Sequence, residues 1–102
     1  MSRLEQLLKL AAACPEDPLT HYAVGLEYMN RQQWAEAVAA FERALAIDSQ
    51  YTAAYYHKAR AEIRWGRRES AKQTLAVGMA CASAKGDLKT EREMRELLET
   101  LG

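Results

Sequence analysis

Apolar residues recur along this chain with the spacing of α-helices and not with the alternation of β-strands. Leu4, Leu7, Leu8 and Ala11 follow an i, i+3, i+4, i+7 pattern, which places them on one face of a helix. The clearest stripe of this kind lies further along the chain and consists of Trp34, Ala37, Val38, Phe41, Ala44 and Leu45. The pattern predicts an all-α protein of six helices joined by tight turns, without a linker long enough to divide domains.

Residues typical of helix ends punctuate this pattern. Ser2 followed by Glu5 predicts a capping box, Asp17-Pro18 suits a helix start, and Gly86-Asp87 combines a C-cap with the next N-cap. The first helix is therefore expected to end at "CPEDP", and the second to run from 18 to about 30. The third helix carries the stripe that begins at residue 34, and it is expected to end at "DSQ". The fourth and fifth helices are expected to span roughly 52–65 and 68–84, and the sixth to follow residue 87.

The chain also repeats itself with a shift of 34 residues. When residues 18–51 are laid over 52–85, Gly25 falls on Ala59, Ala37 on Ala71, Phe41 on Leu75 and Ala44 on Gly78. The flanks keep the same phase, because residues 1–17 have the pattern of a second helix and 86–102 that of a first helix. A period of 34 residues with two helices in each unit is that of the tetratricopeptide repeat.

Residues 18–51 resemble that family position by position. Gly25 and Tyr28 match its small and aromatic residues in the first helix, and the matches in the second helix are Trp34, Ala37, Phe41 and Ala44. His21 and Ser49 depart from the pattern, and in the weaker second unit Glu62 and Gly78 replace an aromatic residue and an alanine. The resemblance implies a right-handed α-α superhelix of antiparallel helix pairs, as in the short stand-alone repeat proteins of bacteria. It implies one domain over 1–102, with an N-terminal helix in 1–17, repeats at 18–51 and 52–85, and a C-terminal capping helix in 86–102.

Small residues inside the predicted helices point to close packing. Gly25 should cost its helix about 1 kcal/mol relative to alanine, and a close approach of the paired helices explains its presence better than a ligand does. Larger residues are expected to fill the wider gaps beside such contacts. The predicted packing residues are Gly25, Tyr28, Trp34, Ala37, Phe41, Ala44, Ala59, Ala71, Leu75 and Gly78.

A second apolar stripe remains on the helix over 18–30, formed by Leu19, Tyr22, Leu26 and Met29. A helix that is apolar nearly all round is either deeply buried or offers one face to something else. The resemblance implies that this stripe faces a concave groove that binds a peptide or a helix of another protein. The predicted groove residues are Tyr22, Leu26, Met29, Asn30, Tyr56, His57, Arg60, Ile63 and Arg64.

Charge is distributed unevenly although it sums to zero. Residues 52–85 hold seven Lys/Arg and two Asp/Glu, a net of +5, whereas 1–51 carry −3 and 86–102 carry −2. A partner with an apolar stripe and an acidic flank suits this surface. The plainer interpretation is a solvated basic face, with Arg60 and "RWGRR", that pairs with the acidic last helix. A third hypothesis, RNA binding, is disfavoured by the zero net charge and the lack of a known RNA-binding module. One subtype of the family binds the acidic C-terminal tails of chaperones through a clamp of lysines and asparagines in the groove. That function is rejected here because Tyr22 and Leu26 stand where the clamp needs Lys and Asn.

Self-assembly is the alternative function, because so short a stack leaves its end faces poorly capped. The last helix or a second copy of the chain could cover the groove, and a homodimer through the groove or the terminal helices would follow.

No catalytic or metal-binding motif is present, so we expect no enzyme, cofactor or metal. His21 and His57 lack a Cys or Asp at ligand spacing, and Glu62 is expected to be half buried beside Arg60 or Lys58. Cys14 and Cys81 are expected to be buried or half-buried free thiols in a reducing cytoplasm. No apolar run is long enough to span a membrane, and the N-terminus is interpreted as an amphipathic helix and not as a secretory signal.

Overall fold

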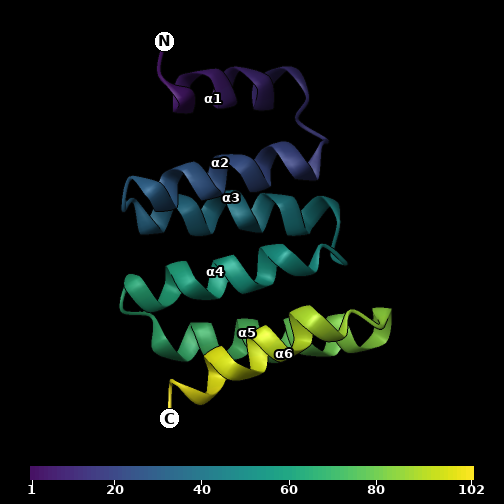
Figure 1. Ribbon diagram of the computed structural model, residues 1–102. Coiled ribbons are helices and arrows are strands. Elements are labelled where there is room, and N and C mark those ends of the chain that lie inside the picture. Colours follow the sequence, from purple (N-terminus) through teal and green to yellow (C-terminus); the bar gives the residue numbers. More distant parts are fainter.

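The computed structural model describes residues 1–102 and contains six α-helices and no strand (Figure 1). This confirms the predicted all-α fold, and the fourth and fifth helices end within one residue of the expected positions. The helices are α1 (Arg3–Ala13), α2 (Pro18–Asn30), α3 (Trp34–Ile47), α4 (Thr52–Arg64), α5 (Arg68–Lys85) and α6 (Leu88–Glu99). None of them is long and apolar enough to cross a membrane.

Hydrogen bonds at the helix ends explain these boundaries. Ser2 Oγ accepts from the Glu5 amide at 3.1 Å while Glu5 Oε1 accepts from the Ser2 amide at 3.3 Å, which is the predicted capping box. Asp17 Oδ1 caps α2 by accepting from the Leu19 amide at 3.0 Å. Helix α5 ends because Gly86 adopts a left-handed conformation with φ of 76°, which glycine does without steric cost.

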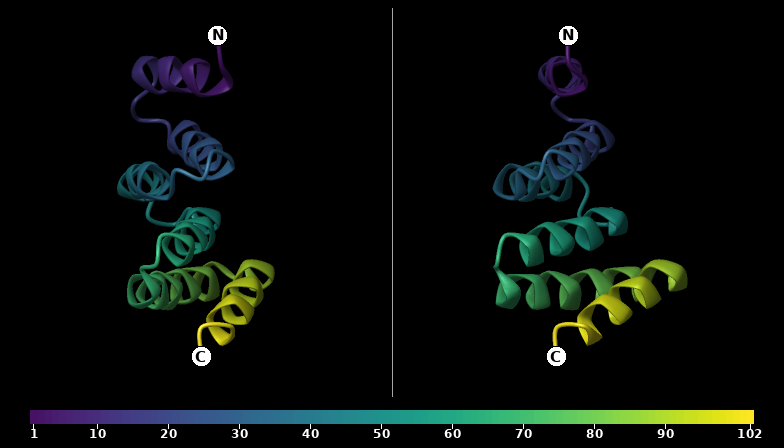
Figure 2. Two further views of the ribbon diagram at one scale, coloured as in Figure 1. Left: turned by 90° about the vertical axis from the view of Figure 1, so that its left-hand side faces the viewer. Right: turned by 60° about the vertical axis from the view of Figure 1, so that its left-hand side comes forward.

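The helices stack in chain order to form a right-handed superhelix. Each helix packs against the one before and the one after it, and α4 also contacts α2 and α6. Viewed from the side, α2, α4 and α6 form one layer and α3 and α5 lie in the other (Figure 2). The two termini lie at opposite ends of the stack, whose longest dimension is 40 Å (Figure 1).

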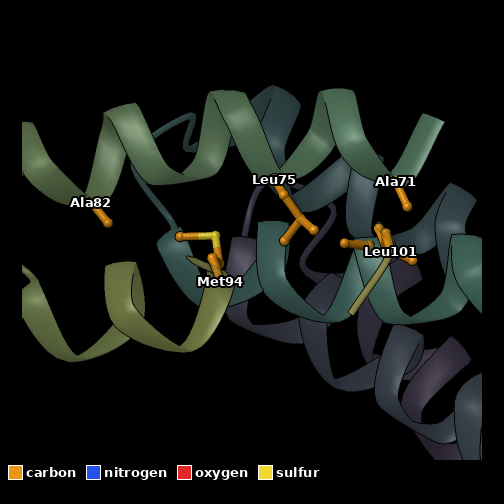
Figure 3. Close-up of a cluster of buried hydrophobic side chains, with 6 residues drawn as sticks. Ala71, Leu75, Ala82, Met94 and Leu101 are labelled. Atoms are coloured by element: carbon orange, nitrogen blue, oxygen red, sulfur yellow. The ribbon is translucent and has the colours of Figure 1, made fainter. Parts of the chain in front are cut away.

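The core consists of two clusters, one for each half of the stack. The first contains Ala37, Val38, Phe41 and Ala61, with α2 side chains packed against it. The second joins α4 and α5 to α6 and the C-terminal residues, and the side chains of Leu75 and Ala82 on α5 and of Met94 on α6 extend into the space between these two helices (Figure 3). Because Met94 and Leu101 are buried here, α6 is an integral part of the stack.

Both helical glycines lie at points of close helix approach. A Cβ on Gly25 would lie 2.5 Å from Cε1 of Phe41, and one on Gly78 would lie 2.6 Å from both Sδ of Met94 and Cβ of Tyr55. No real Cβ contact is so short, so neither position has space for a side chain. The other small residues expected at packing positions, Ala37, Ala44, Ala59 and Ala71, are fully buried.

Helix α1 differs from the others because it buries no residue completely. It packs only against α2, and Leu8 and Leu10 remain 41% and 48% exposed. Cys14, at its C-terminal end, is exposed, so the expectation of a buried or half-buried thiol is wrong there; Cys81 is half-buried, and both are free. The end of the stack at α1 therefore has an uncovered apolar surface.

Candidate functional site

A groove of about 620 Å³ opens on the layer formed by α2, α4 and α6. It lies between α2 and α4, with the start of α3 at one side and one residue of α6 at its edge. We call it the main groove. It is lined by Leu26, Met29, Asn30, Gln32, Trp34, His57, Arg60, Ile63, Arg64 and Leu97.

Most of the predicted groove residues line this cavity. They do so because α2 and α4 are the first helices of successive repeats, and equivalent positions on these helices are 34 residues apart. Leu26 is followed after one repeat by Arg60, and Asn30 by Arg64. The residues that were predicted for the groove and that line it are Leu26, Met29, Asn30, His57, Arg60, Ile63 and Arg64.

Tyr22 and Tyr56 do not line the main groove. The ring centroid of Tyr22 lies 5.0 Å from that of Tyr51 and 5.7 Å from that of His57, so it belongs to an aromatic cluster beside the groove. Burial raises the pKa of Tyr22. The rings of Tyr56 and His57 form a T-shaped pair with 5.2 Å between their centroids. Both tyrosines therefore support the groove from the side.

Three lining residues were not predicted for the groove: Gln32, Trp34 and Leu97. Trp34, expected only as a packing residue, is half-buried at the wall, where the guanidinium carbon of Arg64 lies 5.1 Å from its ring centroid. Leu97 comes from α6, outside the two repeats. Helix α6 therefore borders the groove and does not cover it.

His57 lies in the groove as a neutral acceptor for Arg60. The guanidinium Nη1 of Arg60 lies 3.4 Å from Nδ1 of His57. Burial lowers the pKa of His57, the positive charge of Arg60 lowers it further, and Glu93 of α6 acts in the opposite direction. A neutral imidazole can accept the hydrogen bond from Arg60.

The groove arginines have no carboxylate partner within the chain. Arg60 and Arg64 are exposed, and neither belongs to one of the five ion pairs. The basic face is solvated, as the plainer interpretation expected, but its expected ion pairs with the acidic last helix do not form. Arg68 instead donates to the Leu101 carbonyl at 2.8 Å.

Glu62 is more buried than expected. It lies near Lys58, as expected, because both residues line one cleft and the charge of Lys58 acts on its carboxyl group. Its hydrogen bond, however, comes from Thr74 of α5, which donates to Oε1 at 2.7 Å. Lys58 pairs with Glu42 at 3.5 Å. Burial raises the pKa of Glu62, while the Thr74 hydrogen bond and the charge of Lys58 oppose this rise.

The main groove combines apolar side chains with two arginines and a histidine. The structure contains no group of three or more His, Cys, Asp or Glu side chains that could hold a metal ion. His21, the second histidine, is buried with Nε2 2.8 Å from the Pro15 carbonyl.

A family model described as tetratricopeptide repeat matches residues 28–84. A protein of this repeat type from Salinibacter ruber is 31% identical and superposes with a TM-score of 0.77, over 85% of this chain and 88% of that one. A search of curated proteins found no match.

Two further solved structures match nearly the whole chain. A protein from Bordetella parapertussis is 25% identical and superposes with a TM-score of 0.86, over 99% of this chain and 88% of that one. The TPR2B domain of yeast Sti1, solved as a complex with pHsp70, has a TM-score of 0.91 at 21% identity, over 96% of this chain and 78% of that one. At that identity the second likeness shows the fold alone.

Proposed function

Because the chain belongs to the tetratricopeptide repeat family, we propose that it is a non-enzymatic interaction module whose main groove binds a peptide or helix of another protein. The observation that carries this proposal is an open groove in which apolar side chains lie beside two arginines without a carboxylate partner. The complex of the yeast domain with pHsp70 supports the use of this fold for protein partners.

The chemistry of the groove defines the partner. Leu26, Met29, Ile63 and Leu97 offer an apolar surface, and Arg60 and Arg64 lie at its rim. A segment with an apolar stripe and an acidic flank buries its apolar side chains against the first group and places carboxylates against the second. Such charge complementarity chiefly speeds and orients association. Nucleic acid and membrane are not part of the proposal.

Affinity purification from source cells, read by mass spectrometry, tests the groove. Leu26→Arg places a charge on the apolar floor, and Leu19→Arg makes the same change at a position on α2 that is 60% exposed and outside the groove. The double variant Arg60→Glu/Arg64→Glu tests the basic rim, with Arg43→Glu on exposed α3 surface as its control. We expect the groove variants to lose partners that both controls retain.

Measuring the affinity of a recovered partner segment for the wild type and for each variant then gives the size of each variant's effect on binding. Reversing the charges of both rim arginines should weaken binding about tenfold or more, and the loss should shrink at high salt. A partner set unchanged by groove variants that remain folded would reject the groove as the binding site.

Self-assembly through the terminal helices is the second candidate, and the uncovered leucines of α1 favour it. Light scattering after size exclusion measures the mass of the wild type and of Leu10→Lys. Leu19→Lys, at an exposed leucine of α2 and outside the terminal helices, is the matched control. A dimer that only Leu10→Lys dissociates supports this candidate, whereas a wild-type monomer rejects it.

The two free thiols suit a reducing compartment. We propose the cytoplasm as the location of the protein.

A further inference from the structure

The face opposite the main groove carries a second hollow. No Cα atom of α3 lies within 8 Å of a Cα atom of α5, and two adjoining clefts of about 450 and 340 Å³ open between these helices over α4. The clefts share Glu42, Glu62 and Ser70. We call the two clefts together the α3/α5 trough.

The floor of the trough is formed by a residue that departs from the repeat. One repeat earlier, the position of Glu62 is occupied by Tyr28, a large side chain that packs against the first core cluster. A buried carboxylate in place of an aromatic ring breaks the packing rule of the fold. Departures of this kind are expected at functional sites.

Glu62 is a buried carboxyl group whose hydrogen-bonding capacity is only partly used. Its side chain is 5% exposed, its Oε1 accepts from Thr74, and no hydrogen bond or ion pair within the chain reaches its Oε2. Every side-chain polar atom that is sealed from solvent has a hydrogen-bond partner, so Oε2 is not sealed and opens into the trough. Lys58 acts on Glu62 through its charge but forms its ion pair with Glu42. A buried carboxylate without an ion pair of its own is costly, and a bound cation reduces that cost.

The remaining walls suit a cation on an apolar stem. Val38 and Val77 supply aliphatic surface on the two sides, and Trp65 lies at the rim, 41% exposed. The guanidinium carbon of Arg67 lies 4.3 Å from the Trp65 ring centroid, which shows that the rim accepts a guanidinium. Lys58, the other nearby cation, is held by Glu42.

We propose that the α3/α5 trough binds a basic side chain of a protein partner, an arginine or lysine whose charged end reaches Oε2 of Glu62 and whose stem lies along the aliphatic walls. Trp65 contacts the cation from the rim by a cation–π interaction, in competition with Arg67. The site is separate from the main groove, so the proposal does not rest on the function proposed above.

Single side chains bind weakly, so the test uses NMR titration of the full ¹⁵N-labelled chain. The probes are the N-acetyl, N-methylamide derivatives of arginine, lysine and norleucine, and butylammonium, which has no peptide groups. We expect the arginine and lysine compounds to bind with a Kd on the order of 1 mM. They should shift the amide signals of Val38, Ser70 and Thr74 and the Trp65 indole signal. Norleucine, which has a similar stem without the charge, should give no such shifts.

Substitutions test whether the charge of Glu62 is what holds the bound cation. Glu62→Gln keeps an acceptor for Thr74 and removes the anion, so it should weaken binding about tenfold. Glu99→Gln removes the same charge from the exposed surface of α6 and should leave binding unchanged. Arg67→Ala frees the Trp65 ring and should tighten binding. Circular dichroism verifies that each variant is folded.

Several results would overturn the proposal. These are equal shifts with norleucine, unchanged binding by Glu62→Gln, or an equal loss with Glu99→Gln. Weaker binding by Arg67→Ala would show that Arg67 does not compete with the ligand. Butylammonium carries the charge and stem of a lysine side chain, so it should bind about as tightly as the lysine derivative. Failure of butylammonium to bind would show that the peptide groups of the probes, and not the basic side chain, make the contact.

Discussion

At the scale of single residues, the absence of a side chain at position 25 controls how closely α2 and α3 approach. The ring of Phe41 occupies the space that a Cβ would need, and this ring is fully buried and has nowhere to move. Glycine costs the helix some intrinsic stability, and the packing of Phe41 against the bare backbone offsets that cost.

We therefore expect Gly25→Leu to destabilise the protein by about 1–3 kcal/mol through overpacking. Urea denaturation of the variant gives the free energy of unfolding. Ala46→Leu, which adds the same side chain at an exposed position of α3, is the control and should have little effect. An unchanged midpoint for Gly25→Leu would contradict the role assigned to this glycine.

Glu62 links stability to pH in a definite direction. Its pKa in the folded state is raised above the ordinary 4.5, chiefly by burial, so the folded state keeps this proton to higher pH than the unfolded state. Stability from this group is complete below pH 4.5 and is lost as the pH rises through the folded-state pKa. Glu62→Gln should then be more stable than the wild type at neutral pH and no more stable well below pH 4.5, as measured by urea denaturation at both pH values. Glu99→Gln should show no such pH-dependent gain.

His57 links stability to pH in the opposite direction from Glu62. Its pKa is lowered from the ordinary 6.5 by burial and by Arg60, so the unfolded state takes up the proton first and stability falls as the pH drops below 6.5. Arg60→Gln should raise the pKa of His57, as followed by NMR titration of the imidazole signals, whereas Arg43→Gln should not. An unchanged titration in Arg60→Gln would exclude the Arg60 charge as a cause of the shift.

At the scale of helices, local signals in the sequence were sufficient to predict all six. The capping box at Ser2, the Asp17-Pro18 pair and the left-handed Gly86 act within a few residues of each helix end, so a single sequence reveals them. The groove depends on contacts across the stack and was predicted less completely. Tyr22 lies on the expected stripe of α2, but its ring packs at a tilt against the ring of Tyr51. No local pattern near Leu97 indicates that α6 reaches the groove.

Helix α6 is held mainly by Met94, which is completely buried against α5. Met94→Ala should cost about 2–5 kcal/mol, a large part of the total stability of a small domain. We expect hydrogen exchange to accelerate first in α6 and α5 and much less in α2 and α3, because each helix packs chiefly against its neighbours in the chain. Uniform acceleration through all helices would show instead that the stack unfolds as one unit.

At the scale of the whole molecule, the two ends differ. One end is closed by α6, with Met94 and Leu101 buried beneath it, and the other is formed by α1, which buries nothing completely. We expect the amides of α1 to exchange fastest of the six helices, because opening α1 exposes the least apolar surface. Protection of α1 that grows with protein concentration would show that a second chain covers it.

The placement of the termini also determines how the molecule would respond to a pulling force. The chain enters the stack at one end and leaves it at the other, and each helix adheres mainly to its two neighbours. Tension between the termini would therefore act on the helix–helix interfaces in series, so that each interface bears the full force. Extension should proceed by successive detachments, beginning at the shallow contact of α1 with α2, instead of by one abrupt rupture.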